Sequence, residues 1–456
     1  MKKVLSTVAA LGLVAGLAST AAAVEFKMSG KYYVEGYHLS DGARDAVGTG
    51  ATTGSATIDA KGVDLTEGAG DNNTSDSWYQ HTFEIKPTMK VNDKISMFGT
   101  IRLADETVWG NQANGDVVST SSNNNDVYVH HLYMDYASEI GKIRIGRTPA
   151  GGYGTTFVDT DSRQDRIMWW PSFIPKPWSV LLYTGKVTEG DLAIGDEGSA
   201  NDSDHYEARL YFNTDSVDAG IAYSMTNDNT YVTGVAADPE KELYKGYVQY
   251  KMDNFFANAE IGYYTGENST TVDYDSMGAM LQVGGKFDAL TVSAMYFYAE
   301  GDDTTADGDN ESFLSATGSG TGTEFEPLYV LTGRTAGLLN RDQASSVYTA
   351  GITQAGVHAL VLAADYKVSD RLALHGAVGY AEADEAVQTG GAASYANRDD
   401  EYGWEYNVGA AYKLLDNLTY EAHFGYLDTG DYFKSTATTD DTENVYILSH
   451  HLTMTF

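Results

Sequence analysis

The chain has 456 residues, with 29 basic and 64 acidic side chains, a formal charge of −35 and no cysteine. The absence of cysteine excludes disulfides, thiolate metal sites and cysteine nucleophiles. The acidic excess argues against nucleic acid as a partner, because its phosphates are bound by Lys and Arg. No linker or shift in composition divides the chain into separate domains.

The N-terminal stretch 1–23 is predicted to be a signal peptide. Lys2 and Lys3 precede a short apolar run, and Ala21, Ala22 and Ala23 provide a small-residue cleavage site. A membrane-spanning helix is the alternative, but the run is interrupted by glycine and is shorter than a bilayer requires. Cleavage would leave residues 24–456 with 27 of the 29 basic residues against 64 acidic ones, a formal charge of −37.

The exported chain is predicted to consist of β-strands, since apolar and polar residues alternate with period two along many short stretches. The expected strands lie at 24–39, 78–90, 94–104, 126–138, 142–148, 165–171, 178–188, 205–214, 217–226, 242–252, 255–265, 274–287, 290–300, 357–368, 371–382, 401–414, 418–428 and 443–456. This gives about 18 strands, an even number as bacterial single-chain barrels have, with about 16 as the alternative. The fold expected is therefore an all-β transmembrane antiparallel barrel.

The connections between these strands are of two kinds. Short turns such as Asp253-Asn254 and Asp416-Asn417 contain residues that tolerate positive φ and suit tight hairpins. Long acidic connections alternate with them, and the largest is 301–356. Short periplasmic turns and long outer loops are the asymmetry of outer-membrane barrels, so 301–356 is expected to be an outer loop.

Charged residues within the strands favour a water-filled interior. In 418–428, Glu421 and His423 alternate with aromatic and apolar residues. Burying such residues in a small soluble core would be costly, whereas in a lumen they stay hydrated. Tyr and Trp gather near strand ends, which is typical of the aromatic girdles at the two membrane interfaces.

The last strand, 443–456, separates clearly into two faces. Tyr446, Leu448 and Phe456 belong to an apolar face that only His450 interrupts. A barrel needs its last strand to pair with its first, because this removes the open sheet edge. With its terminal Phe, this stretch resembles the ending of bacterial outer-membrane porins. The resemblance implies that Phe456 serves barrel closure and is read by the barrel-assembly machinery.

The stretch from Tyr133 to Arg147 resembles the hairpin that precedes the constriction loop of general-diffusion porins, including its final Gly-Arg. In that family the following loop folds into the lumen, so the resemblance implies an inward-folded constriction loop at 149–165. It also implies that Asp159, Asp161 and Asp165 offer carboxylates to the pore.

Strand alternation suggests which basic residues would face these carboxylates. Arg102, Arg144 and Arg209 are expected on the inner wall with Asp135, and Arg147 at the margin of the loop. Acidic and basic groups opposed across a constriction create a transverse field that favours polar solutes. The alternative for these arginines is salt bridging within the lumen, without control over solutes.

The function expected is that of a porin in the outer membrane of a Gram-negative bacterium, a water-filled channel for passive diffusion of small hydrophilic solutes and ions. Neither an enzymatic activity, a metal nor a cofactor is expected. Weak cation selectivity is expected, because predicted inward positions include Glu35, Glu84, Glu207, Glu260, Glu405 and Glu421. A substrate-selective channel and a surface structural or adhesive barrel with a plugged lumen remain as alternatives. The expected partners are outer-membrane lipids and lipopolysaccharide, and the resemblance implies a homotrimer.

Overall fold

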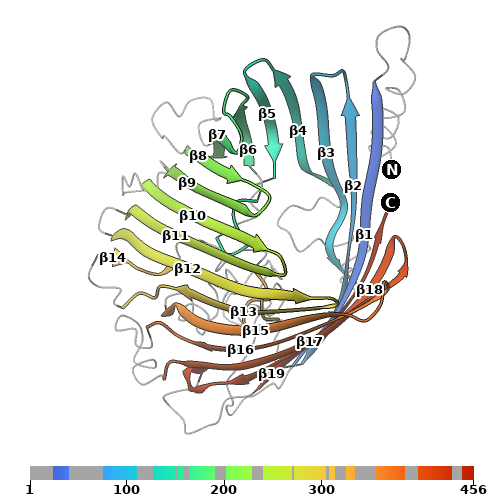
Figure 1. Ribbon diagram of the computed structural model, residues 1–456, viewed down its shortest axis with the longest axis vertical. Helices are drawn as coiled ribbons and strands as arrows, with labels where there is room; N and C mark the ends of the chain where they lie inside the picture. Colours follow the sequence, from blue (N-terminus) through green and yellow to red (C-terminus); the bar gives the residue numbers. More distant parts are fainter. Residues whose placement is uncertain are drawn as a thin grey trace, which may run out of the picture.

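The structure, a computed structural model, is a closed antiparallel barrel whose strands follow one another round the wall in chain order (Figure 1). It describes residues 24–40, 75–109, 127–149, 152–158, 164–189, 202–228, 240–269, 272–303, 308–313, 325–333, 355–385, 399–433 and 444–456. Eighteen strands form the wall, and β14 (Asp309–Asn310) is a two-residue strand that pairs in parallel with β12.

Each wall strand corresponds to one strand expected from the sequence, so the expectation of 18 strands is confirmed over 16. The wall strands are β1 (Glu25–Leu39), β2 (Asp76–Lys90), β3 (Ile95–Val108), β4 (Tyr128–Ser138), β5 (Gly141–Thr148), β6 (Gln164–Pro171), β7 (Trp178–Thr188), β8 (Ser203–Asn213), β9 (Val217–Asp228), β10 (Glu240–Met252), β11 (Phe255–Ser269), β12 (Val272–Phe287), β13 (Leu290–Ala299), β15 (Val357–Lys367), β16 (Leu372–Glu382), β17 (Glu401–Leu415), β18 (Leu418–Thr429) and β19 (Val445–Thr455). The largest differences are in β3 and β11, which end at Val108 and Ser269, each four residues later than expected. The extension of β3 passes an irregularity in its pairing with β2, where Glu106 has φ 47°.

The barrel closes where β19 pairs with β1 in antiparallel register. At the end of this seam, the Gly30 amide donates to the Phe456 carbonyl over 2.9 Å, and the Phe456 amide donates back over 3.1 Å. A Cβ on residue 30 would lie 2.3 Å from the Phe456 ring, so only glycine leaves room for it. The terminal phenylalanine thus occupies a position shaped by the first strand.

The short turns expected from the sequence lie at the end of the barrel that carries this seam junction. Two of them, at 253–254 and 288–289, are hairpins in which Asp253 and Asp288 both have φ 51°. Aspartate tolerates this left-handed conformation better than most residues, which explains its use in these turns. The opposite end carries the longer connections, as the sequence indicated, except that only two positions separate β11 from β12.

The two faces of the wall differ in chemistry. Large apolar side chains such as Ile221 (63% exposed) and Val408 (59% exposed) project outward, whereas Glu207, Glu260 and Glu405 are buried on the inner side. An apolar outer face is what contact with lipid requires. The described part of the chain contains no helix with the length and apolar character needed to cross a membrane.

Candidate functional site

The candidate site is the lumen, which two chain segments enter. The first internal segment, 152–158, comes from the connection between β5 and β6 and lies against the inner faces of β10 and β11. The Thr155 amide donates to Glu260 Oε2 over 2.7 Å, and the Thr155 hydroxyl donates to the same oxygen. Gln249 Nε2 donates to the Gly154 carbonyl over 3.3 Å. One buried carboxylate and one amide therefore hold the backbone of this segment inside the barrel.

The second internal segment, 325–333, comes from the long connection between β13 and β15. Its Val330 and Leu331 amides each donate over 2.8 Å to one of the two carboxylate oxygens of Glu405, which is fully buried on β17. Buried amides left without such an acceptor would each cost about 1–3 kcal/mol. Glu405 therefore anchors this segment as Glu260 anchors the first one.

The position of the second internal segment corrects the expectation that 301–356 is an outer loop throughout. Leu328 approaches the inner wall so closely that a Cβ on Gly379 would lie 2.6 Å from its side chain. The Tyr329 hydroxyl lies 2.9 Å from His423 Nδ1, also on the inner wall. The physical reason is apolar: Leu328, Val330 and Leu331 are fully buried, and water would oppose their exposure on an outer loop.

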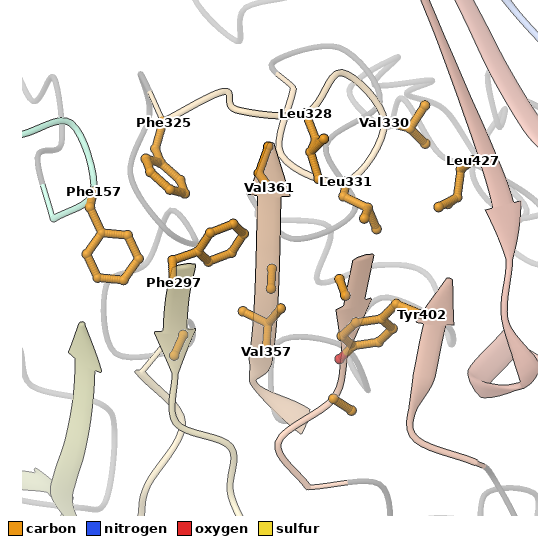
Figure 2. Packing of buried hydrophobic residues seen from close by; sticks show 14 of the residues in the cluster. Phe157, Phe297, Phe325, Leu328, Val330, Leu331, Val357, Val361, Tyr402 and Leu427 are labelled. Carbon is orange, nitrogen blue, oxygen red and sulfur yellow. The ribbon is translucent and has the colours of Figure 1, made fainter. Parts of the chain in front are cut away.

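The two segments meet in an apolar cluster within the barrel (Figure 2). The Phe157 ring stacks on Phe313 with centroids 6.0 Å apart and meets Phe325 edge to face at 5.2 Å. Phe325 in turn meets Phe297 of β13 edge to face at 5.0 Å. Edge-to-face and offset arrangements suit the charge distribution of aromatic rings, so these contacts join both segments to the wall.

We call the inner faces of β13 and β15–β18 the covered wall, because the second internal segment and the apolar cluster lie on them. Figure 2 shows Val357, Val361, Tyr402 and Leu427 projecting from these strands toward the cluster. Val357, Tyr402 and Leu427 are fully buried. Around these residues the lumen holds a dry, packed core rather than a hydrated channel wall. Further along the same strands, Asp365 and His375 form an ion pair at 2.8 Å whose side chains are 63% and 31% exposed.

We call the inner faces of β2–β5 the open wall. Arg144 donates to both carboxylate oxygens of Asp135 over 2.7 and 2.9 Å, and its guanidinium lies 4.2 Å from the Tyr133 ring centroid. The side chains of Arg144 and Asp135 are 19% and 18% exposed, which separates them from the fully buried covered wall. A two-point arginine contact of this kind fixes both groups in orientation.

The other expected wall arginines are paired in the same way. Arg102 contacts Glu84 at 3.1 Å and Asp105 at 2.7 Å, each on the inner side. Arg209 contacts Glu207 at 2.5 Å within the part of the wall that the first internal segment covers. The structure therefore places each of these arginines in the lumen. Their partners, however, are carboxylates of the wall itself and not carboxylates of a loop.

The loop residues of the expected constriction set lie elsewhere or outside the described residues. Asp165 pairs with Arg147 at 3.5 Å, and both side chains are about half exposed, at 61% and 49%. On β6, Asp165 has the opposite parity to buried Arg166 and Met168, and on β5 Arg147 has the opposite parity to inward Arg144. Asp165 and Arg147 therefore project from the outer face at the rim, which corrects their expected place in the pore. Asp159 and Asp161 fall outside the described residues.

Two lumen residues were not selected from the sequence as pore residues. Arg166 is buried on the inner face of β6, and it donates to the Pro149 carbonyl over 3.1 Å, which ties down the start of the loop. Lys241 lies on the inner face of β10 over the Tyr264 ring. Alternation offered a signal for both, because Arg166 shares its parity with Met168, and Lys241 shares its parity with Leu243 and Lys245.

No family model matches the sequence, and no curated protein is similar to it. Among solved structures, the chain is similar to OccK9 (OpdG) of Pseudomonas aeruginosa, with 12% identity, 95% of this chain and 99% of that chain covered, and a TM-score of 0.52. OpdQ of the same organism gives 10% identity, 94% and 97% coverage, and a TM-score of 0.51. OccK3 (OpdO) of that organism gives 9% identity, with 94% of this chain and 96% of that chain covered, and a TM-score of 0.51. At these identities the likeness establishes the fold, an 18-strand closed barrel.

Proposed function

We propose that this protein is a porin of a Gram-negative outer membrane, through which small hydrophilic solutes and ions diffuse passively. The observation that carries the proposal is the open wall, an ion-paired and partly exposed surface inside a barrel whose outer face is apolar. Such a wall stays hydrated and supplies the polar surface along which ions and polar solutes move. A channel of this kind performs no bond chemistry.

The narrowest part is proposed to lie between the first internal segment and the open wall. Glu260 holds this segment to β11 on the far side of the lumen, while Arg144 and Asp135 lie on the open wall. Because these wall groups are already paired, their fields largely cancel at a distance. Discrimination between solutes would then come mostly from size and from local contacts. A substrate-selective channel remains the alternative within this class.

Weak cation selectivity is part of the proposal and rests on composition. The open wall carries Glu84, Asp105 and Asp135 against Lys86, Arg102, Lys142 and Arg144, so it adds no excess of carboxylates. The acidic excess of the chain is concentrated in connections such as 301–311, which holds five acidic residues and no basic one. Acidic groups at a pore mouth raise the local concentration of cations, and salt screens this effect.

Export, assembly and partners follow from the same proposal. Cleavage after residue 23 would release the chain for insertion among outer-membrane lipids and lipopolysaccharide, with the assembly machinery recognising the strand that ends in Phe456. A homotrimer is the proposed assembly. Chemical crosslinking of the native outer membrane followed by denaturing electrophoresis tests it, since a ladder that stops at three copies is expected.

A surface structural or adhesive barrel is the second candidate, and one specific observation favours it. The apolar cluster occupies part of the lumen, and a cluster extended to the open wall would close the channel. A single measurement distinguishes the two candidates. Purified barrel in planar bilayers, studied under a KCl gradient, should give a steady open conductance and a reversal potential of weak cation preference. A barrel that inserts without conducting would overturn the channel and support the plugged form.

A further inference from the structure

A small cavity of about 150 Å³ lies between the first internal segment and the inner faces of β6–β11. At about 30 Å³ per water molecule it has room for about five waters. Its lining includes four cationic side chains, Arg166, Arg209, Lys241 and Lys245, and the single carboxylate of Glu207. We call it the basic pocket, because its cations outnumber its carboxylates by three in a chain whose formal charge is −35.

Two of the cations share the one carboxylate. Arg209 Nε lies 2.5 Å and Lys245 Nζ 3.5 Å from the same oxygen of Glu207. Arg209 is only 5% exposed, so little water reaches its guanidinium group. A single negative charge cannot neutralise two neighbouring positive ones, and a low local dielectric increases the attraction for a further anion.

An aromatic ring holds the two arginines of the pocket in place. The guanidinium carbons of Arg166 and Arg209 lie 5.3 and 5.4 Å from the centroid of the Tyr183 ring. The Tyr183 hydroxyl also donates to Glu207. Groups fixed in this way lose little freedom when a ligand arrives, so the pocket is organised before binding.

The surroundings of Lys241 independently indicate that the pocket binds an anion. Its ammonium lies 4.5 Å from the centroid of the Tyr264 ring and 4.9 Å from that of Tyr274. Within the described ranges of the chain it forms no ion pair. A partly buried ammonium held only by ring faces has given up water without gaining a counter-charge, and this costs free energy. An anion in the adjoining cavity would supply that charge.

We propose that the basic pocket binds one small multivalent oxyanion, of the chemistry of inorganic phosphate, beside the path through the lumen. The proposal rests on the proposed channel function and names a site within it. Guanidinium and ammonium groups are strong ligands for phosphate oxygens, and here they converge from β6, β8 and β10. The small volume excludes larger anions, and the excess of cations favours multivalent anions over chloride.

The test is the reversal potential of the full-length barrel in planar bilayers under a KCl gradient at pH 7.4, titrated with equal potassium phosphate on both sides. Bound phosphate offsets positive charge beside the pore, so the reversal potential should move toward cation preference along a saturating curve. In Lys241→Gln the half-saturating concentration should rise about tenfold, since a hydrogen bond between charged groups is lost. Acetate, a monovalent oxyanion, should act only at higher concentrations than phosphate.

Lys31→Gln is the matched control. Lys31 is also a lysine that faces the lumen over a tyrosine ring, 4.2 Å from the Tyr33 centroid, but it lies on β1 outside the pocket. This variant should keep the wild-type titration curve. Equal changes in both variants, or a wild-type reversal potential that phosphate does not move, would overturn the pocket while leaving the channel proposal standing.

Calorimetric titration of the purified wild-type barrel with phosphate does not depend on conductance or on the folding of a variant. Heat that saturates at one phosphate per chain is expected. A barrel that binds phosphate without conducting would overturn the channel but keep the pocket. A barrel that conducts and gives no saturable heat would overturn the pocket alone.

Discussion

The open wall and the covered wall are built from the same kind of strand but hold their charged residues in opposite ways. On the open wall, Arg144 and Asp135 pair side by side and keep about a fifth of their surface exposed. On the covered wall, the carboxylate of Glu405 is fully buried and accepts two backbone amides of the second internal segment. Inward carboxylates thus have two roles in one barrel. Some form part of a hydrated surface, and others hold an internal segment against the wall.

This difference shows that period-two alternation fixes which side chains point inward but not whether water reaches them. Water reaches the open wall because no described segment lies on it, so its charges pair with one another at modest cost. Where the second internal segment lies, the covered wall is dry, and a carboxylate there is tolerated only because backbone donors compensate for its lost hydration. The role of an inward residue is therefore decided by the loops.

Removing the anchor of the covered wall should have the largest effect. Glu405→Ala deletes two hydrogen bonds and leaves two buried amides unpaired, which costs about 1–3 kcal/mol for each amide, and should release the second internal segment. We expect a larger and noisier single-channel conductance. Glu421→Ala is the control, because Glu421 faces the lumen from β18 without a hydrogen bond to the described part of either internal segment. An unchanged conductance in Glu405→Ala would mean that the apolar contacts hold the segment without the anchor.

Truncating the apolar cluster should weaken the barrel without necessarily opening it. Phe325→Ala removes a buried ring that contacts both Phe157 and Phe297, and such truncations cost about 3–5 kcal/mol. The temperature at which the folded electrophoretic band converts to the unfolded one should fall. Phe287→Ala, on the outer face and 47% exposed, should lower it less. Equal decreases would contradict a packed core inside the lumen.

On the open wall the expected effect is smaller and electrostatic. Arg144→Gln leaves the carboxylate of Asp135 without its guanidinium partner in the lumen, so the reversal potential under a KCl gradient should move toward cation preference, most visibly at low salt. Arg147→Gln removes the same charge from the outer rim three residues away in the same strand. It should leave the reversal potential unchanged, and a similar shift in both variants would refute the assignment of the two faces.

The seam belongs to neither wall, and a change there should leave conductance and selectivity as they are. Phe456→Ala removes the ring that lies over Gly30. We expect less folded barrel in the outer membrane, measured as the heat-modifiable band, while each assembled channel conducts like the wild type. Wild-type amounts of barrel would argue against a role of Phe456 in assembly.

The sequence predicted the strands, the turns and the inward arginines because each depends on local alternation or on turn residues. Asp165 was misplaced because it was assigned to a loop. It belongs to β6, where its parity with outward Ile167 places it on the outer face opposite Arg147.

The second internal segment was harder to predict, because its position depends on contacts with strands far away in the sequence. One signal was present: the stretch from Phe325 to Leu331 is apolar within a long polar connection. A loop with such a stretch has reason to enter the barrel. The pairing of its amides with Glu405 could not be read from local pattern, since 75 and 74 positions separate the partners.

The seam also sets how this chain must fold. Along most of the wall, each strand pairs with the next one in the chain, so the loops that these pairings close are far shorter than the whole chain. The pairing of β1 with β19 is different, since His38 and Tyr446 hydrogen-bond across 408 positions. Bringing such distant residues together is entropically unfavourable until the intervening sheet has curved far enough to hold them near each other. Ring closure is therefore the cooperative step, and until it occurs both edges of the growing sheet remain open to pairing with other chains.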